Sequence, residues 1–240
     1  MKEKIYAMIP ARIGSQRLKM KNLALIDGKP LIYFSIQASK KTKLFNKVII
    51  NSDHVIFSKI ANRYNVDFYL RPKSIGLSKT KSDDVVYNFI KKNPEADIVV
   101  WVNSIAPLVQ SEDLYKIINY FKKKKLDSLI TVEKKQVHAT FKKRPVNFDF
   151  RGKFLKTQNI MPVNVFSYAV MMWRTNIFLR EYKKNKSAFF CGRFSEYCLE
   201  SKKSFIVKNI EDLRLIEHLV KFKKQKNFYK PKYDKLCKYI

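Results

Sequence analysis

A loop rich in basic residues holds the side chains with the clearest potential for chemistry. Its sequence, IPARIGSQRLKMKNL, covers residues 9–23, follows a short apolar segment and carries Arg12, Arg17, Lys19 and Lys21. Cations gathered in one loop neutralise negative charge that develops when a phosphoryl group is transferred. The loop is therefore interpreted as a polyphosphate-binding loop, although the spacing alone leaves an ordinary basic surface turn equally open.

Gly14 and Ser15 in the middle of this loop are small enough to let backbone N–H groups approach an anion. The loop is not a Walker loop, because the GxxxxGK[ST] spacing is absent. It is also not a dinucleotide fingerprint, which needs three glycines where this loop has one. The sequence thus indicates a phosphate site of another kind.

Short β-branched runs alternate with segments of helical periodicity along most of the chain. This pattern predicts an α/β fold in three layers, with a mostly parallel central sheet. Expected strands cover residues 5–10, 47–51, 67–70, 97–103, 163–173 and 204–207. Expected helices cover residues 31–40, 55–64, 82–92, 111–125, 176–182, 194–199 and 211–220.

The regular pattern fails between Glu133 and Pro162, where Arg144, Pro145 and Gly152 interrupt any helix or strand. We interpret this stretch as an arm, approximately residues 133–165, inserted into a single domain that spans 1–225. Residues 226–240 form a tail in which lysines alternate with aromatic residues. Such a composition can stack on nucleic-acid bases or lie on an anionic surface.

The chain has 50 Lys and Arg against 20 Asp and Glu, a formal net charge of +30. Only ten of the basic residues are Arg, the type that bidentate recognition of phosphate and guanine favours. Nucleic-acid binding is therefore the less favoured interpretation of the charge. No apolar run approaches the roughly 18 residues of a membrane span, and an odd set of cysteines suits a reducing compartment: Cys191, Cys198 and Cys237. We expect a cytoplasmic protein.

The string A-R-x-G-S-x-R-L-x-x-K-N-L, from Ala11 to Leu23, resembles the nucleotide-binding signature of the acylneuraminate cytidylyltransferase family. Relatives in that family activate 3-deoxy-manno-octulosonate, legionaminate and pseudaminate. Further segments match the family in the same order: 27–31, 52–53, 71–72, 106–108 with 112–113, and 157–163.

This resemblance implies a nucleotidyltransferase fold of the Rossmann type, similar to GT-A, with an arm for dimerisation and sugar binding. It implies that a hydroxyl of an acidic sugar attacks the α-phosphorus of CTP, forming a CMP-sugar for surface polysaccharide and releasing pyrophosphate with the help of Mg²⁺. Family members are usually homodimers in which the arm reaches the neighbouring active site.

The resemblance also implies roles for single residues. Arg12 and Lys21 would be catalytic, binding the triphosphate and stabilising the leaving pyrophosphate. Asn103 and Gln158 would face the sugar. The implied nucleotide-binding set is Arg12, Ser15, Arg17, Lys21, Asn22, Arg71 and Ser82.

Two departures from the family pattern affect the expected chemistry. Where the family has the metal-binding D-I-D, this chain has the run 206–208, Ile-Val-Lys, which leaves Asp53 and Asp212 as the candidate metal ligands. A stabilising interaction with a helix dipole is the simpler interpretation of Asp212. Ile105 and Ala106 replace a Thr-Ser pair and remove two hydroxyls. A nucleotide-binding member with impaired or altered catalysis is therefore the alternative.

Overall fold

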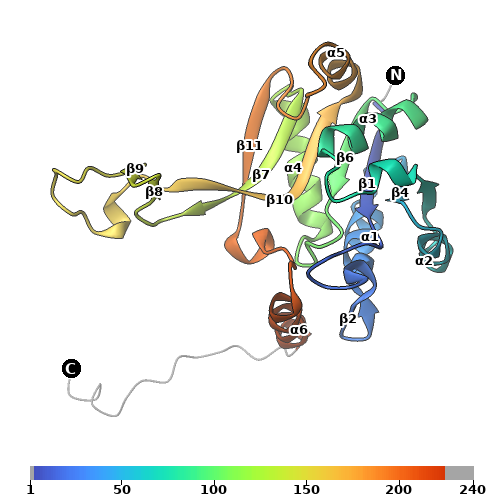
Figure 1. Ribbon diagram of the computed structural model, residues 1–240, viewed down its shortest axis with the longest axis horizontal. Coiled ribbons are helices and arrows are strands. Elements are labelled where there is room, and N and C mark those ends of the chain that lie inside the picture. Colours follow the sequence, from blue (N-terminus) through green and yellow to red (C-terminus); the bar gives the residue numbers. More distant parts are fainter. Residues whose placement is uncertain (1–2, 225–240) are drawn as a thin grey trace.

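A seven-stranded sheet forms the centre of the molecule in the computed structural model, which describes residues 3–224 (Figure 1). The strand order is β11-β7-β10-β6-β1-β4-β5, and every neighbouring pair is parallel except the two pairs that β10 makes. The strands of this sheet are β1 (Ile5–Ala11), β4 (Lys47–Ser52), β5 (Asp67–Leu70), β6 (Ile98–Val102), β7 (Ser128–Lys135), β10 (Val163–Arg174) and β11 (Phe194–Leu199).

Helices cover both faces of the sheet and complete three layers. Apolar side chains of α1, α2 and α4 join one core cluster, and those of α3 and α5 join a second cluster on the other face. The helices are α1 (Leu31–Thr42), α2 (Ile56–Tyr64), α3 (Ser82–Lys92), α4 (Ser111–Lys123), α5 (Thr175–Asn185) and α6 (Ile210–Lys224).

Strand β1 shows why the central strands have continuous apolar sequences. Ile5 and Ile9 pack into the first cluster, while Tyr6 and Met8 point the other way into the second. Successive side chains of a strand alternate between faces, so a sheet covered on both sides needs apolar residues at every position.

A small hairpin and the last helix extend the body beneath the carboxyl ends of the strands. Strands β2 (Leu25–Ile26) and β3 (Lys29–Pro30) form the hairpin, and α6 packs beside it through Leu213 and Ile216. The Val207 N–H bonds to the Ile105 carbonyl at 2.9 Å, which fixes the segment before α6 against the loop after β6. The start of α6 therefore lies close to the end of the sheet where the parallel strands finish.

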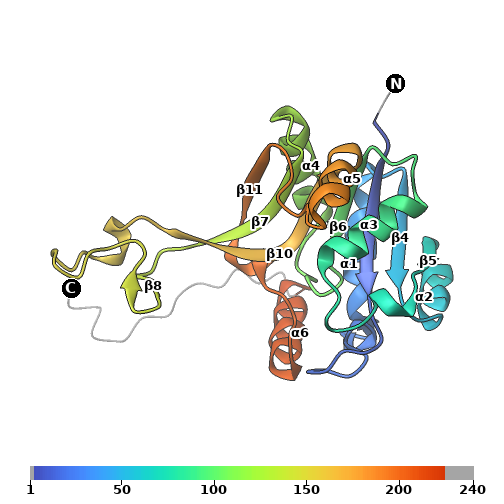
Figure 2. The same ribbon diagram turned by 45° about the horizontal axis from the view of Figure 1, so that its top comes forward.

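The arm projects far from the body in both views (Figures 1 and 2). The end of β7 and the start of β10 continue outward as a paired ribbon and lead to a short hairpin, β8 (Thr140–Phe141) with β9 (Arg144–Pro145), and a turn of 3-10 helix, η3 (Thr157–Asn159). Its exposed surface is notably apolar, and the side chains concerned are Phe141, Val146, Phe150, Phe154 and Met161.

The fold class expected from the sequence is confirmed, with three local errors in the sheet strands. Residues 194–199 form the edge strand β11 rather than a helix, because pairing with β7 outweighs the local pattern. Residues 204–207 were expected as a strand. Ser204 instead ends a 3-10 helix, η4 (Ser201–Ser204), and the following residues lie across the sheet end. Strand β7 was missed, and the tail 226–240 lies outside the described residues.

Within residues 3–224 the structure has no helix long and apolar enough to span a bilayer.

Candidate active site

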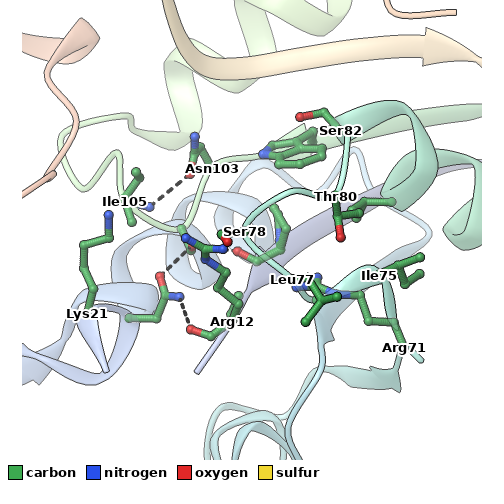
Figure 3. Close-up of a pocket in the computed structure, with 17 residues that line it drawn as sticks. Arg12, Lys21, Arg71, Ile75, Leu77, Ser78, Thr80, Ser82, Asn103 and Ile105 are labelled. Atoms are coloured by element: carbon green, nitrogen blue, oxygen red, sulfur yellow. Dashed lines mark hydrogen bonds between the residues drawn. The ribbon is translucent and has the colours of Figure 1, made fainter. Parts of the chain in front are cut away.

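A cavity of about 330 Å³ opens at the carboxyl ends of β1, β5 and β6 (Figure 3). This is the edge of an α/β sheet at which ligands usually bind. Its charged lining residues are three cations, Arg12, Lys21 and Arg71, and among the described residues no Asp or Glu lines it. The remaining walls come from four places. They are the β6 end (Trp101, Asn103, Ser104, Ile105), the loop after Arg71 (Ile75, Gly76, Leu77, Ser78, Thr80), α3 (Ser82, Val85), and the residues Pro10, Ala11 and Asn22. The cavity is thus suited to an anionic ligand.

Lys21 follows the irregular part of the basic loop and lies beside Ile105 in Figure 3, opposite the loop that carries Ile75 and Leu77. Its pKa is lowered, first by burial and then by the positive charges of Arg17 and Arg12, while Asp212 acts in the opposite direction. A bound anion would relieve this repulsion. The free site therefore holds unbalanced positive charge ready for a phosphate group.

Asn22 fixes the basic loop to the end of the sheet. Its side chain is only 4% exposed, and its amide donates to the Arg12 carbonyl at 3.4 Å. The Ser104 hydroxyl lies 2.8 Å from Asn22 Oδ1 and 2.6 Å from the Pro10 carbonyl. Asn22 therefore positions the backbone that carries Arg12 and Lys21.

Arg71 reaches the cavity from the end of β5. Its side chain is buried, and Nη1 donates to the Asn51 carbonyl at 2.8 Å while Nε has no partner. Burial lowers the pKa of Arg71, and the charge of Asp53 opposes this shift. The guanidinium is thus held in place with donor capacity left for a ligand.

Asn103 lines the cavity but is occupied by its own neighbours. Its Nδ2 donates to the Tyr168 carbonyl at 3.0 Å, and its Oδ1 accepts the Ile105 N–H at 3.3 Å. Tyr168 has a positive φ of 54° and lies in the irregularity of β10 between Phe166 and Met171. That irregularity presents the carbonyl to Asn103.

Of the residues expected at the site, Arg12, Lys21, Asn22, Arg71, Ser82 and Asn103 share the cavity. Ser15 and Arg17 lie in the same loop outside the lining, although Arg17 is close enough to affect the pKa of Lys21. Gln158 lies in η3 on the projecting arm, where it accepts a hydrogen bond from Thr157, so the chain does not bring it to its own cavity.

The two candidate metal ligands both have structural partners. Asp53 Oδ1 accepts the Ile13 N–H at 3.2 Å. Asp212 Oδ2 accepts the N–H groups of Lys208 and Asn209, and Asn209 Oδ1 accepts the Asp212 N–H, which caps the start of α6. No group of three His, Cys, Asp or Glu residues gathers anywhere in the described part of the chain. The residues present do not fit a Mg²⁺ ion held by protein carboxylates.

Sequence reasoning missed several lining residues, above all Trp101, Ser78 and Thr80. In the expected strand 97–103, Trp101 lies two residues before Asn103; in the structure Asn103 directly follows β6. Residues two apart in a strand share a face, which is a signal that was available in the sequence. The residues of the loop after Arg71 carry no comparable pattern.

The chain is similar in sequence to one protein family and to several characterised proteins. Residues 6–232 match the profile of the family described as Cytidylyltransferase. An N-acylneuraminate cytidylyltransferase of Streptococcus agalactiae is 24% identical over 243 residues, which cover 95% of this chain and 58% of the relative. The chain thus spans less than two thirds of the streptococcal protein.

One further similarity concerns the sequence and another concerns the structure. The post-translational flagellin modification protein B of Campylobacter coli is 25% identical over 228 residues, covering 91% of this chain and 96% of that protein. A solved structure of CMP:2-keto-3-deoxy-manno-octonic acid synthetase complexed with CTP superposes with a TM-score of 0.69 at 15% identity, covering 92% of this chain and all of that one. At this identity the structural likeness concerns the fold.

Proposed function

Because the chain belongs to the cytidylyltransferase family, we propose that it transfers CMP from CTP to an acidic sugar and releases pyrophosphate. The sugar is of the sialic acid type or another nonulosonic or octulosonic acid. The observation that carries this proposal is the cavity itself: among residues 3–224, three cations and no carboxylate line it, at the end of the sheet where such folds bind ligands.

The cations would act on the triphosphate. In the reaction, a sugar hydroxyl oxygen bonds to the α-phosphorus while the bond to the pyrophosphate oxygen breaks. Arg12 and Lys21, which both line the cavity, would hold the outer phosphates and stabilise the charge that builds up on the leaving pyrophosphate. Transfers of this kind depend mainly on positioning and electrostatic stabilisation, and Asn22 with Ser104 provides that positioning by bracing the loop.

Mg²⁺ would enter this reaction with the nucleotide. It supplies positive charge to the triphosphate and commonly retains waters and few protein ligands. We assign it no protein ligand, because Asp53 and Asp212 serve a loop contact and a helix cap.

The two halves of the substrate would lie on either side of this phosphate position. Arg71 and Ser82 face the side of the cavity formed by the loop after β5, which suits the cytosine base. Asn103, with its amide fixed by Tyr168 and Ile105, would border the sugar.

Gln158 would complete the sugar side from a second copy of the chain. The arm carries Gln158 away from its own body and exposes Phe154 at 82% and Met161 at 76%. Exposed apolar surface of this extent marks an interaction surface. A homodimer in which each arm reaches the partner's cavity would account for both features. The use of CTP supports a cytoplasmic location, where the protein would make activated sugars for surface polysaccharide.

Pyrophosphate release from CTP with a panel of nonulosonic and octulosonic acids tests this function. Release that depends on one of these acids supports it. A second function has its own observation: Lys208 stands where the family has a metal-binding aspartate, and Ile105 and Ala106 replace two hydroxyl residues, which fits a protein that binds CTP without efficient transfer. CTP binding without turnover on any acid would favour that alternative.

A further inference from the structure

Trp101 is the one residue of β6 that is not buried. The other four residues of the strand are buried, whereas Trp101 lines the cavity and packs against the second core cluster. In the sheet Trp101 pairs with Met8 of β1 and Met171 of β10, so its backbone is held between two central strands. The indole is therefore a rigidly mounted wall of the candidate site.

The indole N–H of Trp101 has no hydrogen-bond partner in the described part of the chain, although its nitrogen is shielded from solvent. The contrast with Trp173 is direct, because Trp173 is fully buried and its Nε1 donates to the Phe189 carbonyl at 2.9 Å. Buried donors in native proteins are nearly always paired, and an unpaired one is costly. An unpaired donor on the wall of a cavity points to an acceptor supplied by a ligand.

The polar side chains that follow Trp101 on the β6 end do not supply that acceptor. Asn103 Oδ1 already accepts the Ile105 N–H, and the Ser104 hydroxyl lies against Pro10 and Asn22. A second unpaired donor, Arg71 Nε, belongs to the same lining. Among the buried polar side-chain atoms without a partner in the described residues, the Trp101 and Arg71 nitrogens are the two that belong to residues lining the cavity.

We propose that Trp101 is a substrate-binding residue whose indole packs against the bound substrate and donates its Nε1–H to a substrate oxygen. The acceptor is a carbonyl or hydroxyl oxygen of CTP or a carboxylate oxygen of the sugar acid. This inference rests on the proposed function, since it assumes that these substrates occupy the cavity.

The chain offers a clean test because Trp101 and Trp173 are its two tryptophans. Protein labelled with ¹⁵N-tryptophan gives two indole N–H signals, which Trp101→Phe and Trp173→Phe assign by deletion. CTP is added first. In a second arm, sugar acid is added to protein saturated with CMP, which has no pyrophosphate to lose. We expect the Trp101 signal to move downfield in one of the two arms while the Trp173 signal stays.

Binding constants complete the test. Trp101→Phe keeps an aromatic wall but removes the donor, and we expect it to weaken binding of the contacted substrate by roughly 3- to 10-fold. Trp173→Phe, checked for folding by its melting curve, leaves that affinity unchanged. The inference is overturned if wild-type protein is saturated by both ligands, the Trp101 signal does not move and Trp101→Phe binds as tightly. If neither substrate binds wild-type protein, the proposed function fails and the role of Trp101 falls with it.

Discussion

The Asp53 carboxylate accepts the backbone N–H of Ile13 at 3.2 Å and thereby connects the end of β4 to the start of the basic loop. On its other side Asp53 lies directly against Gly76, in the loop that follows Arg71. One side chain thus joins the two loops that enclose the cavity. A carboxylate expected among the metal ligands thus connects the basic loop to the loop after Arg71.

The contact between Gly76 and Asp53 leaves no room for a side chain. A Cβ at position 76 would lie 2.6 Å from Asp53 Cβ, so Gly76→Ala must displace one of the two loops. We expect a loss of about 1 to 3 kcal/mol in the free energy of unfolding, together with weaker CTP binding. Gly152→Ala is the matched control, because its new Cβ meets ordinary contacts of 3.6 Å on the arm. Equal denaturation midpoints for the two variants would contradict the bracing role of Asp53.

The lowered pKa of Lys21 predicts how CTP binding depends on pH. Burial and neighbouring cations lower this pKa below 10.5 in the free protein, and a bound triphosphate favours the charged amine. Affinity is therefore complete below the pKa of the free Lys21 and falls as pH rises through it. Lys21→Arg should extend binding to higher pH, since a guanidinium stays protonated. Titrations at several pH values measure this, and superimposable profiles for the two proteins would exclude Lys21 as the titrating group.

Chelation separates protein-held metal from metal carried by the nucleotide. Because the cavity is lined by cations and Asp212 caps α6, we expect CTP binding to persist in EDTA within about tenfold of its value in Mg²⁺. Asp212→Asn should leave the ratio of the two affinities unchanged. Calorimetry with and without Mg²⁺ provides the ratio. Loss of binding in EDTA, reproduced by Asp212→Asn in the presence of Mg²⁺, would assign a metal to Asp212.

The apolar arm predicts the oligomeric state. Phe154 is 82% exposed, so Phe154→Glu introduces a charge at the proposed interface. We expect the variant to elute as a monomer with light scattering, and to lose activity because Gln158 no longer reaches a partner's cavity. Leu25→Glu, at an exposed position on the β2 hairpin, is the control and should remain dimeric. A wild-type monomer, or a dimeric Phe154→Glu, would refute the arm as the interface.

The sequence predicted the central fold well because local pattern and tertiary structure agree there. The boundaries of β5 and α3 coincide with the expected ones, since turns and apolar periodicity mark both ends. Residues 194–199 were expected to be helical but form the edge strand β11. The expectation failed because an edge strand owes its conformation to pairing with β7, a contact that no local pattern encodes.

The residues of the candidate site also fall into those that the sequence predicted and those that it did not. The phosphate loop is continuous in sequence, so Arg12, Lys21 and Asn22 were found together, and they share the cavity. Trp101 was missed because it reads as one more apolar residue of a buried strand. Its spacing from Asn103 indicates a shared face, but the unpaired indole N–H on the cavity wall is visible only in the structure.

Transfer of CMP at this cavity is tested most directly by comparing pyrophosphate release from CTP by wild-type protein, Lys21→Ala and Lys19→Ala. Lys19 belongs to the same loop but is exposed and does not line the cavity. We predict that wild-type protein releases pyrophosphate only when an acidic sugar is present. The rate of release should fall roughly 100- to 1,000-fold in Lys21→Ala and stay near the wild-type rate in Lys19→Ala. Full activity in Lys21→Ala, or no release by wild-type protein with any acid in the panel, would contradict it.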